Sequence, residues 1–161
     1  QGATTIWERL NSYTHTDGFG GNNRMNSFNH YSFGAVGAWL YNHSLGIQRD
    51  ESSPGFKHFI LHPEPDPSGL MTFAKGHYDS MYGRIESAWK LTETGCSYHF
   101  VVPANTSATL YFEAGSSDDI LAYQQPLKQI KKVQYLGFRN GKHAFELSSG
   151  IYDIEVKKGK K

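Results

Sequence analysis

Apolar residues recur at helical spacing in the first third of the chain. Between Phe28 and Ile47 they fall three and four positions apart, which places them on one stripe of a helix. The stripe consists of Phe28, Tyr31, Ala35, Val36, Trp39 and Leu40, with His43 near its end. Asn26 or Ser27 is a candidate cap for the helix start, and Gly46 is a typical stop. The pattern predicts one amphipathic helix, whose apolar stripe needs a partner surface.

The segment ahead of this helix, Thr16 to Arg24, is rich in glycine and asparagine. These residues tolerate positive φ angles, so the composition predicts an irregular loop. Asp17 stands before a glycine, which is typical of a turn, although a carboxylate in such a loop is also a candidate for a sugar site. Loops of this kind often shape functional sites because a scaffold holds their ends.

After Pro54 and Gly55 the pattern changes to short alternating runs separated by turn residues. Eight strands are expected, at 56–62, 70–78, 84–91, 97–102, 108–113, 130–136, 143–147 and 151–156. The residues between the last two, Ser148 to Gly150, indicate a tight hairpin turn. Short strands at regular spacing predict a mainly β fold, an antiparallel β-sandwich of the jelly-roll kind.

The change from helical to alternating spacing places a domain boundary near Ser53. Residues 1–52 are expected to close a helical domain whose body is absent, because one helix cannot form a core alone. Residues 53–161 are expected to form the β-sandwich. The first residues, Gln1 to Ala3, contain no initiator methionine, so we expect the chain to begin inside a longer polypeptide.

Composition narrows the classes of function. The hydrophobic fraction of 38% supports a packed core, and the net charge of +1 provides no field for a nucleic acid. The single cysteine, Cys96, allows no intrachain disulfide and no standard zinc spacing. No apolar run approaches the ~18 residues of a membrane span. We expect no nucleic-acid partner, no membrane span and no cofactor.

Glu8 is the first candidate for chemistry. It lies between Trp7 and Arg9, so its carboxylate has a large ring on one side and a fixed positive charge on the other. The ring suits a sugar platform, and the arginine favours an ionised carboxylate that acts as a base. The alternative is an ordinary surface ion pair near a helix end.

A second candidate cluster surrounds the predicted helix start. Asn29 and His30 both carry groups that hydrogen-bond sugar hydroxyls. The alternatives are that Asn26 or Ser27 simply caps the helix and that His30 is a partly buried histidine with its bonds satisfied. The other histidines are scattered over different strands without metal-ligand spacing, so no metal site is expected.

Five separated motifs occur in the order found in one enzyme family. They are GATTIWER at 2–9, MNSFNHYSFGAVGAWLY at 25–41, PGFKHF at 54–59, YDSMYGRIESAW at 78–89 and VPANT at 102–106. The first two resemble the end of the catalytic domain of bacterial α-L-rhamnosidases. The last three resemble the C-terminal β-domain of the same family.

The resemblance implies the last loop and helix of an (α/α)6 barrel followed by a β-sandwich. It implies inverting hydrolysis of terminal α-L-rhamnosyl linkages, with Glu8 at the position of the general base and His30 at that of a histidine that contacts rhamnose. Leu10 departs from the family, which often has tryptophan there. The general acid and the aromatic lining of the pocket are expected from upstream sequence.

Two functions follow from these observations. In the first, the chain is part of an α-L-rhamnosidase, with Glu8 catalytic and with Trp7, Asn29 and His30 binding substrate. Its partners are then rhamnose-containing glycosides or polysaccharides and the missing N-terminal barrel of the same polypeptide. In the second, the chain is a non-catalytic β-sandwich module for carbohydrate binding or domain packing.

Overall fold

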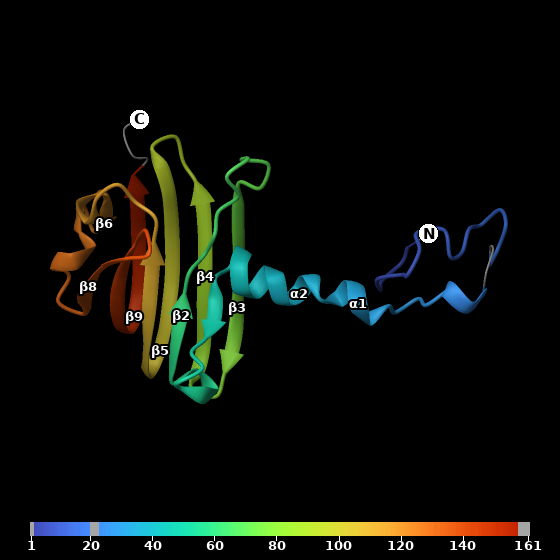
Figure 1. The fold of residues 1–161 in the computed structure, drawn as a ribbon, viewed down its shortest axis with the longest axis horizontal. Helices are drawn as coiled ribbons and strands as arrows, with labels where there is room; N and C mark the ends of the chain where they lie inside the picture. The colour runs from blue at the N-terminus through green and yellow to red at the C-terminus, as the bar shows by residue number, and fades with distance from the viewer. Residues whose placement is uncertain (1, 20–22, 158–161) are drawn as a thin grey trace. The chain divides into compact units, whose positions relative to one another are not determined.

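The fold is that of a computed structural model, which describes residues 2–19 and 23–157. The chain forms two compact units, one that ends at Trp39 and one that starts at Leu40. Each unit is described by itself below (Figure 1). The boundary predicted near Ser53 between a helical and a β domain stays a prediction.

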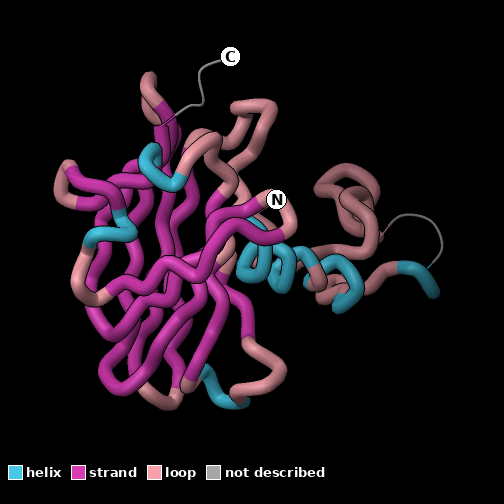
Figure 2. The backbone as a smooth tube through the Cα atoms, turned by 60° about the vertical axis from the view of Figure 1, so that its left-hand side comes forward, coloured by secondary structure: helices cyan, strands magenta, loops and turns pink. Residues whose placement is uncertain are grey.

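The first unit is mostly loop, as Figure 2 shows. It contains a 3-10 turn, Asn23–Met25, and two short helices, α1 (Tyr31–Gly34) and α2 (Val36–Trp39). The predicted helix therefore begins three residues late and is interrupted. Glycines at 34 and 37 lower its helix propensity. The predicted caps are wrong, because the N-cap is His30 and no side chain caps this end.

The second unit begins with a π-helical turn, Leu40–Ser44, and its described residues, up to 157, contain nine strands. The strands are β1 (Ile47–Arg49), β2 (His58–Leu61), β3 (Phe73–Ser80), β4 (Gly83–Leu91), β5 (Gly95–Phe112), β6 (Ile120–Ala122), β7 (Gln125–Pro126), β8 (Val133–Arg139) and β9 (Lys142–Lys157). Three 3-10 turns lie between them, at Pro54–Phe56, Ser117–Asp119 and Leu127–Gln129.

Two long strands, β5 and β9, belong to both layers of the fold (Figure 1). The first half of β5 and the second half of β9 lie in the sheet β3-β4-β5-β9-β6-β7. Their other halves lie in the sheet β1-β2-β5-β9-β8. One continuous hydrogen-bonded network is therefore folded over into a sandwich.

The fold-over occurs where the pairing of β5 with β9 changes register. Val102 pairs with Gly150 and Ser107 pairs with Ser148, so four residues of β5 oppose Ser149 alone. Pro103 has no backbone N–H for the ladder, and Asn105 has a φ of 60°. Extra residues of this kind bend a strand and increase its twist.

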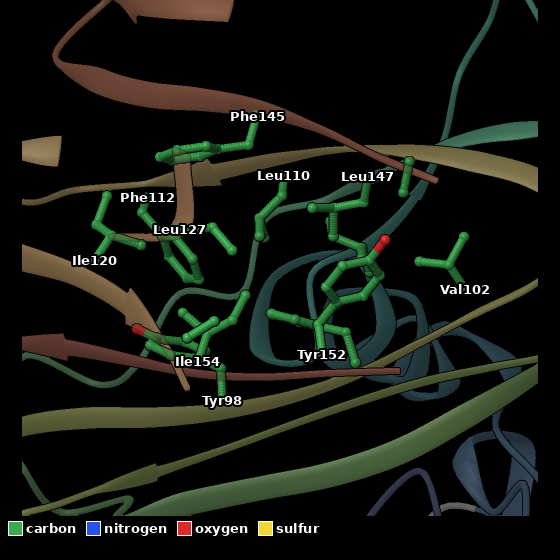
Figure 3. Close-up of a cluster of buried hydrophobic side chains, with 14 of the residues drawn as sticks. Tyr98, Val102, Leu110, Phe112, Ile120, Leu127, Phe145, Leu147, Tyr152 and Ile154 are labelled. Carbon is green, nitrogen blue, oxygen red and sulfur yellow. The ribbon is translucent and has the colours of Figure 1, made fainter. Parts of the chain in front are cut away.

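The core lies between the two layers, and Figure 3 shows its side chains. Leu110, Phe145 and Leu147 point from one layer toward Tyr152 and Ile154 of the other. All five are at most 3% exposed. Alternate residues of β5 and β9 are buried along nearly their whole lengths, as the period of two predicts.

The prediction of a mainly β sandwich is confirmed, although β1, β6 and β7 were not among the expected strands and other details differ. The expected strands at 97–102 and 108–113 are one strand, and so are those at 143–147 and 151–156. The predicted hairpin at Ser148–Gly150 is therefore wrong, because Ser148 and Gly150 both pair with β5. The sheet is also mixed, since β2 runs parallel to β5.

The segment that joins the π-helical turn to β1 is tied to β4. The Trp89 Nε1–H donates to the Ser44 carbonyl at 2.7 Å, and the Ser87 hydroxyl donates to the Leu45 carbonyl at 2.5 Å. Gly46 follows with a φ of +68° and lies against the backbone of His62, where a Cβ would overlap. The predicted stop at Gly46 is thus confirmed.

Within the described residues, no helix has the length and apolar character needed to cross a membrane.

The close approach of β5 to β9 yields a stability prediction. A Cβ at Gly95 would overlap the carbonyl oxygen of Val156, which the β-ladder holds in place. We expect Gly95→Ala to lower the Tm of the chain by about 2–12 °C, because overpacking costs about 1–3 kcal/mol. Thermal unfolding followed by circular dichroism measures the change.

Gly115→Ala is the matched control. A Cβ there meets only Asp119 Oδ2 at 3.8 Å, and Gly115 has no positive φ. Equal Tm values for the two variants would contradict the packing of β5 against β9.

Candidate functional site

The candidate residues of the first unit lie on two segments that pair with one another. The Glu8 N–H donates to the Ser27 carbonyl and the His30 N–H donates to the Ile6 carbonyl, each at 2.8 Å. The Thr5 hydroxyl also bonds the Phe28 carbonyl. These bonds bring Glu8 and His30, which are distant in sequence, to the same place. They also explain why the helix cannot begin before His30.

Arg9 closes the other end of this pairing. Its Nε–H donates to the Met25 carbonyl at 3.0 Å, and its guanidinium also bonds the side-chain oxygen of Asn26. A guanidinium offers several donors in a fixed plane, so it fixes the orientation of what it binds. Asn26 therefore serves as an anchor for Arg9 and not as the helix cap that its sequence position suggests.

The Glu8 carboxylate lies between the two segments and is mostly buried, with 14% of its side chain exposed. Its Oε2 accepts a hydrogen bond from the Ser27 N–H at 3.0 Å. The same oxygen lies 3.9 Å from His30 Nδ1. Among the described residues, nothing is hydrogen-bonded to Oε1. One oxygen is thus anchored while the other remains an available acceptor.

His30 is held on its far side. Its Nε2 lies 3.1 Å from the Ser32 hydroxyl, in the first turn of α1. Its ring also contacts Phe33, with ring centroids 5.0 Å apart. About a quarter of the His30 side chain, 24%, is exposed. The ring is therefore oriented by its neighbours while one edge stays accessible.

Trp7 packs edge-on against Phe28, with centroids 4.8 Å apart. It also lines a shallow cavity of about 260 Å³ with Ile6 and Leu10. Asn29 is exposed, and within the described segments no hydrogen bond joins it to Glu8 or His30. The structure therefore brings Glu8 and His30 together but does not bring Asn29 to them.

The predicted loop before the helix is only partly described, because residues 20–22 lie outside the described residues. Asp17 forms the turn that its glycine neighbour indicated. Its N–H donates to the Thr14 hydroxyl at 2.9 Å, and its carboxylate accepts from the same hydroxyl at 3.2 Å. This carboxylate is satisfied locally.

This arrangement suits proton transfer. A carboxylate that is fixed through one oxygen and free at the other can accept a proton from water. No group of three or more potential metal-ligating side chains occurs in the described part of the chain. The geometry provides one positioned carboxylate and an adjacent imidazole ring.

Two contributors to the site were missed in the sequence. One is the backbone N–H of Ser27, which any residue except proline supplies, so no sequence signal reveals it. The other is Ser32, whose hydroxyl lies two residues beyond His30. A polar residue in the first turn after a candidate histidine is a weak signal that points to it.

The chain matches two domains of one family. Residues 1–44 match the bacterial alpha-L-rhamnosidase 6 hairpin glycosidase domain. Residues 46–122 match the bacterial alpha-L-rhamnosidase C-terminal domain. The join between the two matches falls next to Leu45, at the end of the π-helical turn.

Individual proteins of this kind are similar over nearly the whole chain. An α-L-rhamnosidase of Formosa agariphila is 32% identical over 98% of the chain, and one of Alteromonas sp. (strain LOR) is 36% identical over 91%. The chain spans only 16% and 15% of these relatives. It thus corresponds to a small part of them.

Solved structures of α-L-rhamnosidases are also similar to the chain. The Streptomyces avermitilis α-L-rhamnosidase complexed with L-rhamnose matches with a TM-score of 0.75 and 30% identity over 96% of the chain and 14% of its own. The α-L-rhamnosidase from Dictyoglumus thermophilum matches with a TM-score of 0.72 and 28% identity over 97% of the chain and 16% of its own.

The anchoring role of Arg9 is open to a direct test. We expect Arg9→Ala to speed hydrogen exchange at the Glu8 and His30 amides about tenfold, because hydrogen bonds from a charged group contribute about 1.5 kcal/mol or more. Exchange followed by NMR or mass spectrometry measures it. Thr4→Ala, at an exposed neighbouring position, is the control. Unchanged exchange in Arg9→Ala would show that the two segments pair without the arginine.

Proposed function

The chain belongs to the bacterial α-L-rhamnosidases, and on that premise we propose that its parent protein removes terminal α-L-rhamnose from glycosides with inversion of configuration. In this proposal Glu8 is the general base. The observation that carries it is the Glu8 carboxylate, anchored through Oε2 and open at Oε1.

A general base must hold its accepting oxygen in one place while it takes a proton from water. The Ser27 N–H fixes the Glu8 carboxylate through a backbone group that cannot rotate away. Burial of most of the side chain limits the alternative hydrogen bonds that bulk water offers. Oε1 then deprotonates a water as that water attacks the anomeric carbon.

The neighbouring residues are assigned supporting roles in the same proposal. His30, beside the Glu8 carboxylate and held by Ser32, contacts a rhamnose hydroxyl through its accessible edge. Trp7, packed on Phe28, provides an apolar wall. Asn29 is exposed and has no hydrogen bond to the others within the described segments, so its contact with sugar would be at the rim.

The second carboxyl group of the reaction would come from outside this chain. An inverting glycosidase separates its acid and base by about 6.5–9.5 Å to admit the attacking water. Because the chain spans 16% of its Formosa agariphila relative, most of such a site belongs to the rest of the polypeptide. The chain would supply the base, and the remainder the acid and most of the pocket.

A second candidate function is favoured by the second unit. Its β-sandwich has its own closed core and makes no use of Glu8, so it suits a module that binds carbohydrate or packs against other domains. This function is compatible with the first, because both reside in one polypeptide.

The role of Glu8 is tested in the full-length protein. We expect Glu8→Gln to lower kcat on an aryl α-L-rhamnoside by about 10²–10⁴-fold, since the amide cannot accept the proton from water. The amide keeps the shape of the side chain and its acceptor oxygen for the Ser27 N–H. Steady-state kinetics measures the loss, and circular dichroism checks the fold.

Glu51→Gln is the control for loss of a carboxylate. The Glu51 side chain is 79% exposed, and among the residues that the structure describes its ion-pair partner is Arg49, at 2.8 Å. Its kcat should equal that of the unmodified protein. Turnover by Glu8→Gln at the level of this control would refute the assignment.

A further inference from the structure

A groove lies on the outer face of the sheet that contains β3, β4, β5, β9 and β6. Its volume is about 710 Å³, within the range of small-molecule sites. Two rows of residues that pair across the strands form its floor. One row runs from Lys75 through Ala88 and His99 to Asp153. The other runs from Phe73 through Lys90 and Ser97 to Glu155 and Leu121.

The groove has an aromatic ring at each side. Phe73 lies on the edge strand β3 and is 64% exposed. Tyr123 follows β6 and is 67% exposed. Five neighbouring strands span about 19 Å at the usual spacing, so the floor is long enough for several linked sugar rings. Two small residues in the middle of the floor, Ala88 and Ser97, keep it low between the aromatic rings of Phe73 and Tyr123.

Tyr123 is held over the groove by an unusual turn. Leu121 and Ala122 pair with Pro126 and Gln125, which leaves a two-residue turn of Tyr123 and Gln124. Both have positive φ angles, 51° and 64°. Such turns normally use asparagine or glycine, so tyrosine there costs free energy. Strain of this kind is concentrated at functional positions, and here it presents an aromatic ring beside a groove.

The polar groups of the groove are balanced in charge. Lys75 and Lys90 lie toward one side, and Asp153 and Glu155 lie toward the other. Of these four charged side chains, Asp153 alone has a partner within the described residues, His99 at 2.7 Å. Among the described residues, the side chains of Lys75, Lys90 and Glu155 make no ion pair or hydrogen bond with protein. The floor thus offers both donors and acceptors without a net charge.

We propose that this groove binds a neutral oligosaccharide. Sugar rings have an apolar C–H face that stacks on aromatic rings such as Phe73 and Tyr123. Their hydroxyl groups both donate and accept, so they match a floor of mixed lysine and carboxylate side chains. Because the two lysines balance the two carboxylates, the floor provides no net attraction for a polyanion. The expectation that this glycan contains rhamnose rests on the proposed function. The proposal that the groove binds a neutral oligosaccharide does not.

The test measures binding by the full-length protein through isothermal titration calorimetry. The probe is a neutral tetrasaccharide with internal rhamnose and another sugar at its non-reducing end, which a site for terminal rhamnose does not accept. We expect Phe73→Ala to raise the Kd of this probe about tenfold or more, as for the loss of an aromatic contact that contributes strongly to binding. Tyr123→Asn, which retains a residue suited to positive φ, should weaken it similarly.

Ile151→Ala is the control, because Ile151 is 60% exposed on β9 but does not line the groove. Its Kd should stay within about twofold of the unmodified protein. All three variants should hydrolyse an aryl α-L-rhamnoside normally. Unchanged Kd values in Phe73→Ala and Tyr123→Asn, or no binding by the unmodified protein, would overturn the groove proposal. Absence of aryl rhamnoside hydrolysis by the unmodified protein would overturn the proposed function instead.

Discussion

The pairing of β5 with β9 is the constraint on which the rest of the second unit depends. These two strands run side by side through both layers, and the change of register at residues 103–106 turns one hydrogen-bonded network back over itself. Four strands, β2, β4, β6 and β8, pair directly with β5 or β9. The remaining strands pair with one of those four: β1 with β2, β3 with β4 and β7 with β6. Large side chains of the core, such as Tyr152 and Phe145, come from the two halves that the bend brings face to face.

Alternation along the chain was sufficient to predict the β-sandwich and most of its strands. It could not predict that two pairs of expected strands are continuous. Ser148, Ser149 and Gly150, for example, have the composition of a turn. Their pairing with β5 comes from residues some forty positions earlier, which no local pattern contains. The parallel alignment of β2 with β5 was missed for the same reason. Gly46 was predicted correctly because its positive φ is a local requirement.

In the candidate site, too, the sequence indicates the residues but not the contacts that bring them together. Chemistry and the family resemblance make Glu8 and His30 candidates, but their proximity depends on backbone bonds between Ile6 and His30 and between Glu8 and Ser27. The same bonds displaced the helix start and made the predicted caps wrong. Arg9 also bonds the Met25 carbonyl and the Asn26 side chain, and its place beside Glu8 in the sequence does not reveal these contacts. It acts on the site by fixing the segment that carries the Ser27 donor. Asn29 remains apart from that pair.

The central claim is that Glu8 activates water for a single displacement in an α-L-rhamnosidase. The configuration of the first-formed sugar tests this most directly, because a base that activates water produces inversion, whereas a nucleophilic carboxylate produces retention. ¹H NMR of the full-length protein acting on an aryl α-L-rhamnoside in D₂O resolves the two anomers before they equilibrate. We expect β-L-rhamnose to appear first, and initial release of α-L-rhamnose would contradict the role of Glu8 as a base.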